Sequence, residues 1–249
     1  IETPSFELLE TLLGKYGEEG DRLIFKIINS GEKVKKADLK ALKDNQLARF
    51  SNSLSEKALR YDLTVPFARY VAQYQNDITF PFKRYQIQPV WRADRPQKGR
   101  FQEFFQCDAD AVGSDSLWQE VEFIQLYDAV FTDLKLNGVS IKINNRKVLA
   151  AIAERIGAQD KLIDFTVALD KLDKIGAEKV KEEMLSKGIS SDGIALLTPL
   201  LKISGDFKAQ LKALSSLFRA SQIGMEGLTE LEFIADKINN LGLQSTTLK

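Results

Sequence analysis

The residues with the most chemical potential lie in the segment 83–112, where two stretches of alternating residues flank a basic loop. Side chains alternate across a strand, so residues of one parity share a face. We predict antiparallel strands over 83–92 and 100–112, with even positions opposite even positions. Their shared face then carries directional polar groups and one aromatic ring, namely Arg84, Gln86, Gln88, Arg92, Gln102, Phe104, Gln106, Asp108 and Asp110.

This even face is richer in guanidinium, amide and carboxylate groups than contact with solvent requires. We therefore expect a polar binding floor, and a plain solvent-exposed sheet face is the alternative. The odd positions Tyr85, Ile87, Pro89 and Trp91 are expected to belong to the core. A sheet that is apolar on one side is typical of a sheet laid on helices.

The loop between the two strands carries four cationic side chains, Arg92, Arg95, Lys98 and Arg100, around a proline and a glycine. Guanidinium forks match phosphate oxygens in pairs, so this loop favours binding of a triphosphate over the polar floor. The alternative is a charged hairpin tip, which is common on protein surfaces.

The composition excludes several classes of chemistry. The 249 residues include no His, so imidazole bases, catalytic triads and His metal ligands are absent. The single cysteine, Cys107, excludes an internal disulfide and is compatible with a reducing compartment. Lys and Arg total 35 and Asp and Glu total 35, so no global field favours nucleic acid or membrane. No apolar run is long enough to span a membrane.

The elements that must position these residues follow from periodicity and caps. Before the hairpin we predict a helix over 5–16, strands over 22–28 and 58–63, and a helix to about residue 75 capped by Thr64. After it we predict a helix over 116–134, a strand over 139–143 and a helix over 146–156. Further helices are expected over 168–175, 177–187, 192–203, 206–221 and 227–241.

We thus expect an α+β fold, in which an antiparallel sheet flanked by helices is followed by a small all-helical domain. The expected domains are 1–158 and 159–249. The lysine-rich stretch 31–43 is typical of a solvated segment and only sometimes of a nucleic-acid patch.

Four stretches, 1–7, 59–66, 90–110 and 167–174, resemble the class II aminoacyl-tRNA synthetases, and most closely the histidyl-tRNA synthetases. They are similar to the end of motif 1, the histidine-binding loop, motif 2 with the strand after it, and the start of an insertion domain. The resemblance covers essentially the whole chain.

The resemblance implies roles for individual residues. Arg92 matches the catalytic motif 2 arginine, which binds the α-phosphate of ATP and the amino acid carboxylate. Asp94, Arg100 and Phe104 match other ATP-binding positions, the last being the ring stacked on adenine. The remaining matches are histidine-binding positions, and they are Asp62, Leu63, Thr64, Gln106 and Asp110.

The implied reaction is ATP-dependent activation of L-histidine and its transfer to tRNA(His), in a cytoplasmic homodimer with no membrane partner. The carboxylate of the amino acid attacks phosphorus while already ionised, so a site without histidine can run this step. Mg2+ is expected on the phosphates of ATP, and no protein metal site is expected. The helical segment would clamp tRNA, although its charges are nearly balanced.

The pattern departs from the family because the histidine-specific segment, motif 3 and the anticodon-binding domain do not follow. Asn145 also stands where many relatives have a histidine. We therefore expect an incomplete, inactive fragment of the enzyme. The alternative is the synthetase-like regulatory subunit of ATP phosphoribosyltransferase, a binding module. Arg92, Arg100, Phe104 and the insertion-like helices favour the synthetase.

Overall fold

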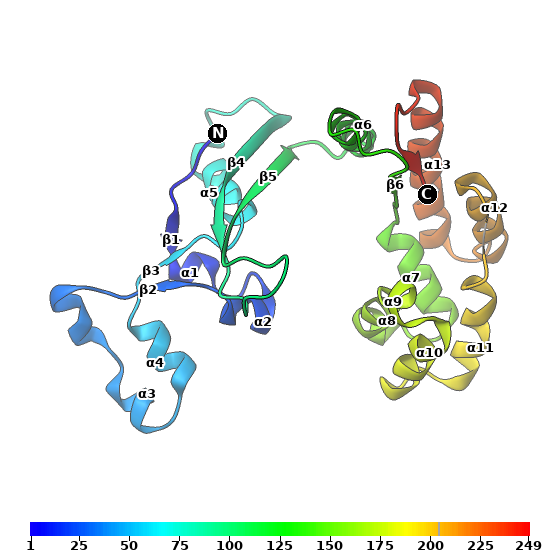
Figure 1. The fold of residues 1–249 in the computed structure, drawn as a ribbon. Helices are drawn as coiled ribbons and strands as arrows, with labels where there is room; N and C mark the ends of the chain where they lie inside the picture. The colour runs from blue at the N-terminus through cyan, green and yellow to red at the C-terminus, as the bar shows by residue number, and fades with distance from the viewer. Residues whose placement is uncertain (204) are drawn as a thin grey trace. The chain divides into compact units, whose positions relative to one another are not determined.

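The computed structural model describes residues 1–203 and 205–249, and it contains both helices and small sheets (Figure 1). The chain forms two compact units, Ile1–Ser114 and Asp115–Lys249, each with its own core. This division does not coincide with the expected domain boundary at 158/159. The reason is packing, because the helix α7 (Arg146–Arg155) lies against α13 (Gln222–Leu241) in the second unit.

The first unit begins with a small antiparallel sheet of order β1-β3-β2 and short helices around it. Its elements before the hairpin are β1 (Phe6–Leu8), α1 (Leu9–Leu12), α2 (Gly17–Arg22), β2 (Lys26–Ile27), the 3-10 helix η1 (Gly31–Lys36), α3 (Leu39–Lys43), α4 (Leu47–Ser53), β3 (Lys57–Leu59) and α5 (Thr64–Tyr74). The predicted strands over 22–28 and 58–63 are confirmed in shorter form. The predicted helix over 5–16 is wrong at its start, because residues 6–8 pair with β3.

The hairpin of β4 (Phe82–Trp91) and β5 (Glu103–Val112) follows α5. Its strands are antiparallel, and Arg84 lies opposite Asp110, Gln88 opposite Gln106, and Val90 opposite Phe104. The predicted pairing of even positions with even positions is therefore confirmed.

The expectation that the odd positions of this hairpin belong to the core is wrong. The odd positions are the exposed ones, since Tyr85 is 73%, Ile87 56% and Phe105 69% exposed. Near Phe82 and Arg84 the even face is covered by α5, whose Phe67 ring lies 6.2 Å from the Phe82 ring and 4.3 Å from the Arg84 guanidinium. Farther along this face, Gln86 and Gln88 are hydrogen-bonded to Thr3. Polar side chains can occupy this buried face because each can be hydrogen-bonded or ion-paired there.

The start of α5 also differs from the prediction. Thr64 is the first residue of the helix rather than its cap, and Leu63 precedes it without a side-chain cap. The Asp62 carboxylate takes the capping role, because its Oδ1 accepts a hydrogen bond from the Val65 N–H at 3.2 Å. A carboxylate serves here because it satisfies a donor that the first helical turn leaves unpaired.

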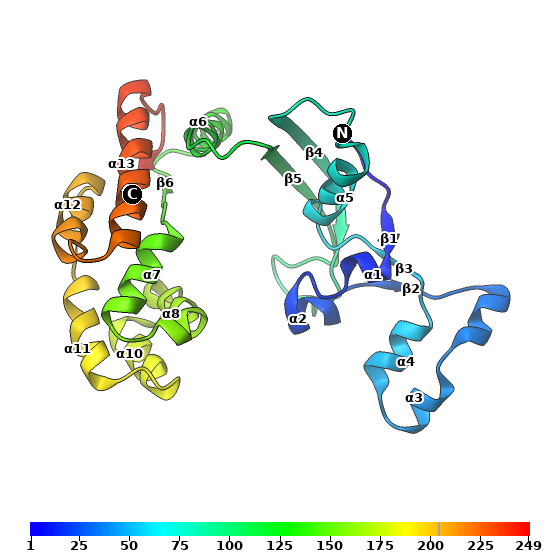
Figure 2. The same cartoon turned by 180° about the vertical axis from the view of Figure 1, so that it is seen from behind.

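The second unit is built mainly of helices. Its elements are α6 (Trp118–Asp133), β6 (Ser140–Ile141), α7, the 3-10 helix η2 (Gln159–Lys161), α8 (Leu162–Leu169), α9 (Leu172–Ile175), α10 (Ala177–Ser186), α11 (Ser191–Leu200), α12 (Phe207–Leu217), α13 and β7 (Thr247–Leu248). Helix α13 packs against α6, α7 and α12 (Figure 1, Figure 2). The expected helix over 168–175 is wrong in its bounds, because α8 ends at Leu169 and α9 starts at Leu172.

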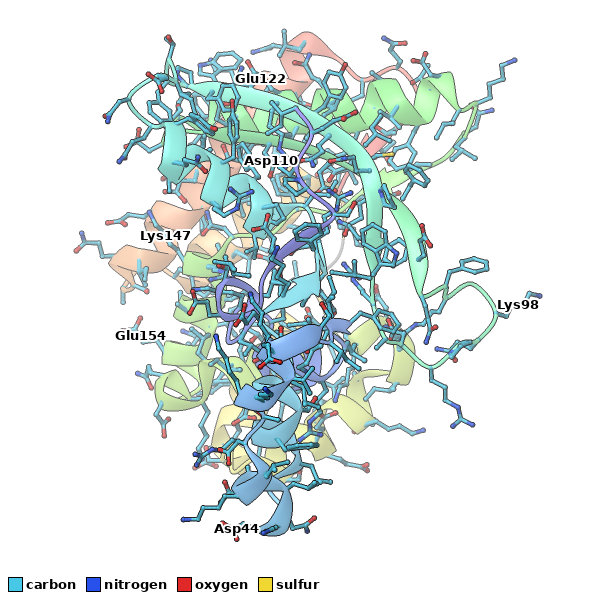
Figure 3. The ribbon with its side chains drawn as sticks, turned by 90° about the vertical axis from the view of Figure 1, so that its left-hand side faces the viewer. Asp44, Lys98, Asp110, Glu122, Lys147 and Glu154 are labelled. Carbon is cyan, nitrogen blue, oxygen red and sulfur yellow. The ribbon has the colours of Figure 1, made fainter. Side chains whose placement is uncertain are left out.

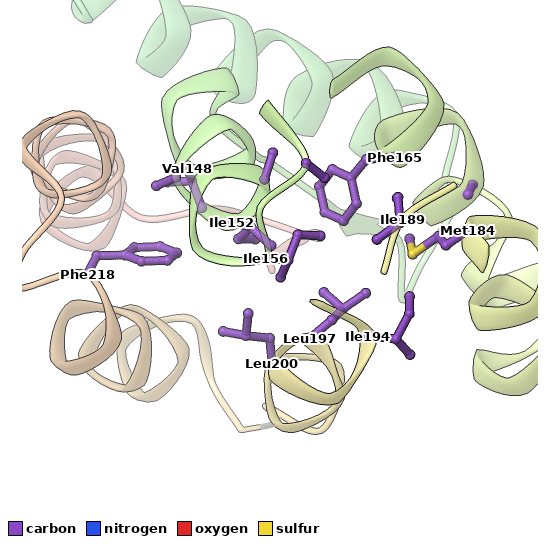
Figure 4. Close-up of a cluster of buried hydrophobic side chains, with 14 of the residues drawn as sticks. Val148, Ile152, Ile156, Phe165, Met184, Ile189, Ile194, Leu197, Leu200 and Phe218 are labelled. Atoms are coloured by element: carbon purple, nitrogen blue, oxygen red, sulfur yellow. The ribbon is translucent and has the colours of Figure 1, made fainter. Parts of the chain in front are cut away.

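One large hydrophobic cluster holds this unit together, and Phe165, Val180 and Met184 in it are fully buried (Figure 4). The unit is not wholly helical, since β7 near the end of the chain pairs in parallel with β6. Among the described residues, no helix has both the length and the apolar character needed to cross a membrane.

Candidate functional site

A cavity of about 520 Å³ opens at the loop end of the hairpin. Its lining includes all four residues expected to bind ATP, which are Arg92, Asp94, Arg100 and Phe104. Small-molecule sites commonly have volumes of about 300–1,000 Å³, so the space suits a nucleotide. The structure therefore gathers the predicted nucleotide residues around one cavity.

Arg92 lies at the centre of this group. Its guanidinium carbon lies 4.4 Å from the centre of the Tyr61 ring and 5.1 Å from that of Phe104. Its Nε donates to the Tyr61 carbonyl at 3.2 Å, and its Nη2 donates to Gln106 Oε1 at 3.3 Å. These bonds use two of the five guanidinium N–H groups, and the two rings hold the plane of the fork in place.

The basic loop over 93–102 supplies the outer part of the cavity. Arg100 Nη1 lies 3.4 Å from Asp94 Oδ1, and the Gln102 side chain donates to the Asp94 carbonyl at 3.1 Å. The Arg100 side chain remains 62% exposed. Lys98 lies on the same loop and points away from the strands (Figure 3). The loop thus presents exposed cations beside the cavity, where an anion could bind them.

The residues expected to bind histidine are spread along the even face of the hairpin and the segment before α5. Gln106, which contacts Arg92, is half-buried. Thr64 and Asp110 line a separate cavity of about 660 Å³ beside α5. Leu63 is fully buried, so only its backbone carbonyl takes part, accepting from Arg84 Nη2 at 3.2 Å. The structure therefore does not gather the residues expected to bind histidine around one pocket. Gln106 and Leu63 are instead connected to the site through hydrogen bonds with Arg92 and Arg84.

Two carboxylates, Asp108 and Asp110, lie at this part of the face, and Asp62 before α5 adds to their charge. Burial raises the pKa of Asp110, the Arg84 guanidinium opposes that rise, and Asp108 and Asp62 add to it. Arg84 Nη2 lies 2.6 Å from Asp110 Oδ2. The Gln106 amide donates to Asp108 Oδ1 at 3.2 Å. Such a cluster suits a cationic or N–H-bearing ligand, because ionised carboxylates only accept hydrogen bonds.

Tyr16 is a site residue that the sequence analysis missed. Its hydroxyl donates to Asp62 Oδ1 at 3.0 Å, and its ring centre lies 4.4 Å from that of Tyr61. Burial, followed by the neighbouring Asp62 charge, raises the pKa of Tyr16 far above its ordinary value. Tyr16 lines the first cavity but lies outside the motif stretches, so no local signal marked it.

This arrangement can bind an anionic nucleotide next to a cationic or N–H-bearing group. The cavity offers two guanidinium groups and the rings of Tyr61 and Phe104, while the neighbouring face offers carboxylates and amides. Aromatic faces and guanidinium forks favour a base and its phosphates, respectively.

Comparison with known proteins assigns the family. A family model described as histidyl-tRNA synthetase matches residues 34–248. The chain is 64% identical to the histidine–tRNA ligase of Christiangramia forsetii, over 100% of this chain and 54% of that protein. It is 60% identical to the histidine–tRNA ligase of Flavobacterium johnsoniae, over 100% of this chain and 56% of that protein. The chain thus spans about half the length of these curated relatives.

The fold is similar to the crystal structure of histidyl-tRNA synthetase from Nostoc sp. PCC 7120. That similarity has a TM-score of 0.78 at 30% identity and covers 100% of this chain and 52% of that chain. The names of the curated relatives do not favour the regulatory-subunit alternative. With a family model matched along most of its length, the chain belongs to the histidyl-tRNA synthetase family.

Proposed function

We propose that this chain supplies the ATP- and histidine-binding part of a histidine–tRNA ligase. The observation that carries the proposal is the position of Arg92, which lies in the nucleotide-sized cavity and also contacts Gln106 on the neighbouring polar face. One guanidinium can therefore meet both an α-phosphate and a substrate carboxylate. The proposed substrates of the ligase are ATP, L-histidine and tRNA(His).

In the proposed first step, a carboxylate oxygen of histidine forms a bond to the α-phosphorus of ATP. The bond from that phosphorus to the bridging oxygen breaks, and pyrophosphate leaves with the electron pair. Arg92 offsets the repulsion between the two anions and the charge that develops at phosphorus. Arg100 and Asp94 hold the loop beside the nucleotide. No protein base is needed, since the attacking carboxylate is already ionised.

The product of the first step is histidyl-adenylate. In the proposed second step, a ribose hydroxyl at the end of tRNA(His) loses its proton and attacks the carbonyl carbon of histidyl-adenylate. The bond from that carbon to the phosphate oxygen breaks, and AMP leaves with the electron pair. The resemblance assigns the helices after residue 158 to the tRNA clamp. It further implies that the complete protein is a homodimer in the cytoplasm. Light scattering on the complete protein tests the dimer.

Mg2+ is proposed to enter with ATP, on the phosphates, where it reduces their negative charge. Among the described residues, no group of three or more His, Cys, Asp or Glu side chains could hold a metal ion. Asp94, the carboxylate in the cavity, is already paired with Arg100. The side chains therefore do not fit a resident metal, and no step is assigned to one.

The test is histidine-dependent exchange of labelled pyrophosphate into ATP. Because the chain spans about half of its curated relatives, the assay uses the complete polypeptide encoded by the gene. Exchange is expected with histidine and not with other amino acids. Arg92→Ala should lower the exchange rate about 100- to 1,000-fold, the usual loss of one preorganised transition-state contact.

Arg219→Ala serves as the matched control, because Arg219 is an exposed cation in the other unit. It should leave the exchange rate unchanged. A wild-type protein that exchanges pyrophosphate without histidine, or not at all, would contradict the proposed function. Equal activity of wild type and Arg92→Ala would contradict the role of Arg92.

A further inference from the structure

Arg84 is a buried cation that matches none of the family positions named above. It lies in β4 opposite Asp110, and its side chain is only 1% exposed. Removing a guanidinium from water is costly, so it persists only where partners surround it. Identifying those partners therefore shows what Arg84 holds in place.

The partners of Arg84 come from separate elements. Nη2 lies 2.6 Å from Asp110 Oδ2 on β5 and donates to the Leu63 carbonyl before α5 at 3.2 Å. Nη1 donates to Gln86 Oε1 at 3.0 Å. The Phe67 ring of α5 lies 4.3 Å from the guanidinium carbon. One side chain thus joins the segment 62–64 to the end of β5.

Both parts of the proposed histidine subsite meet at this side chain. The carbonyl of Leu63, in the 62–64 segment, accepts from its Nη2, and Asp110 is ion-paired with the same nitrogen. Asp110 Oδ2 and Arg84 Nε have no hydrogen-bond partner among the described residues. The Arg84–Asp110 contact is therefore held by charge at short range rather than by an aligned hydrogen bond. Without the Arg84 guanidinium, no other charged group would offset the cost of burying Asp110 Oδ2 among the described residues.

We propose that Arg84 is a positioning residue for histidine, which fixes Asp110 against the 62–64 segment from the buried part of the polar face without touching the substrate. The surrounding charges agree with this role. Asp108 and Asp62 both disfavour the ionised form of Asp110, while Arg84 favours it. The inference rests on the proposed function, because it concerns the histidine subsite of that same reaction.

A purely structural role of Arg84 would change the KM values for both substrates, whereas the proposed role changes the KM for histidine alone. Arg84 lies away from the nucleotide cavity, whose lining does not include it. Loss of Arg84 should therefore raise the KM for histidine and leave the KM for ATP nearly unchanged. A general loss of folding would affect both substrates alike.

The experiment measures KM for histidine and for ATP by pyrophosphate exchange, in the complete polypeptide. Arg84→Met, which removes the guanidinium but keeps an unbranched apolar stem, should raise the histidine KM about 10- to 100-fold. The ATP KM should change less than about twofold. Arg84→Lys retains the charge without the fork and should recover part of the histidine KM.

Arg69→Met is the control, because Arg69 is an arginine of the same unit whose ion pair with Glu7 joins α5 to β1, and it occupies none of the positions named for histidine or ATP. Its histidine and ATP KM values should change together, if at all. Circular dichroism verifies folding of each variant. If Arg84→Met does not fold, the split between the two KM values in Arg84→Lys decides.

Parallel changes in both KM values, or an unchanged histidine KM in folded Arg84→Met, would overturn the role of Arg84. That outcome is distinct from failure of the proposed function, which would appear as absent histidine-dependent exchange in the wild type.

Discussion

Arg60, Arg84 and Asp128 are buried charged residues that are each held by several partners. Arg60 donates through Nε to the Pro89 carbonyl at 2.8 Å and through Nη1 to the Thr3 carbonyl at 2.7 Å. Arg84 follows the same rule on the polar face of the hairpin. At the residue scale, Asp128 is the clearest example in the second unit, because it is an anion held by backbone N–H groups.

Asp128 joins α6 to the turn before β7. Its Oδ2 accepts from the Gln244 N–H at 2.6 Å, and its Oδ1 accepts from the N–H groups of Ser245 and Thr246. Burial alone would raise the pKa of Asp128, but these bonds and the Thr246 hydroxyl outweigh it and lower the pKa to about 2. The ionised form therefore stabilises the fold.

Asp128→Asn is expected to lower the free energy of unfolding by about 1–3 kcal/mol, because it removes charge-assisted hydrogen bonds. In the wild type, the folded pKa lies below the ordinary value of 3.8. The stabilisation that the ionised Asp128 carboxylate gives the fold is thus complete above about pH 4 and is lost as the pH falls toward 2. About 1 kcal/mol of the free energy of unfolding should be lost by pH 3.

Urea unfolding of the chain at pH 7 and pH 3 measures both effects. Asp133→Asn, an exposed residue of the same helix, should behave like the wild type. An Asp128→Asn variant that matches the wild type at pH 7 would refute the assignment.

At the element scale, small residues allow two helices of the second unit to approach closely. A Cβ atom added to Gly227 of α13 would lie 2.9 Å from Lys147 Cβ and 3.0 Å from the Val148 backbone N in α7. Gly224, one turn earlier, faces Ala151 in the same way. The packing of α7 on α13 therefore depends on the absence of side chains at these glycines.

Gly227→Ala should destabilise the chain by about 1–3 kcal/mol, because overpacking outweighs the gain in helix propensity. Thermal unfolding followed by circular dichroism measures the change. Asn240→Ala, at an exposed position of the same helix, is the control and should be neutral or stabilising. An increase in stability for Gly227→Ala would show that the helices can separate at little cost.

At the scale of the whole molecule, the chain divides between residues 114 and 115. The second unit has a large core that draws on α7, α8, α10, α11, α12 and α13. A further cluster joins Val121 and Ile124 of α6 to Ile234 and Ile238 of α13. Both clusters use residues that lie before the expected boundary at 158/159.

We therefore expect residues 115–249 to fold alone and to unfold cooperatively on heating. Residues 159–249 should not, because this shorter piece loses α6 and α7 from the two clusters. Circular dichroism during heating distinguishes the two pieces. Cooperative unfolding of the shorter piece would favour the boundary expected from the sequence.

Much of the hairpin could be predicted because its signals are local. Alternation over β4 and β5 predicts which residues share a face and that even positions oppose even ones, whereas the structure shows the register that places Arg84 opposite Asp110. Motif spacing also marked Arg92, Asp94, Arg100 and Phe104, which line one cavity. Alternation alone could not show which face is buried, because that depends on where α5 packs.

The sequence by itself determined which hairpin residues share a face and most helices of the second unit, since these depend on local periodicity, and its motif stretches marked the family. The tertiary structure decided the rest. It placed α5 over the polar face, so that Arg84 is buried and Tyr85 is exposed. It also brought Tyr16 to Asp62 and the chain near residue 245 to Asp128. The physical reason is that these contacts join residues far apart in the chain, whose meeting depends on packing of whole elements.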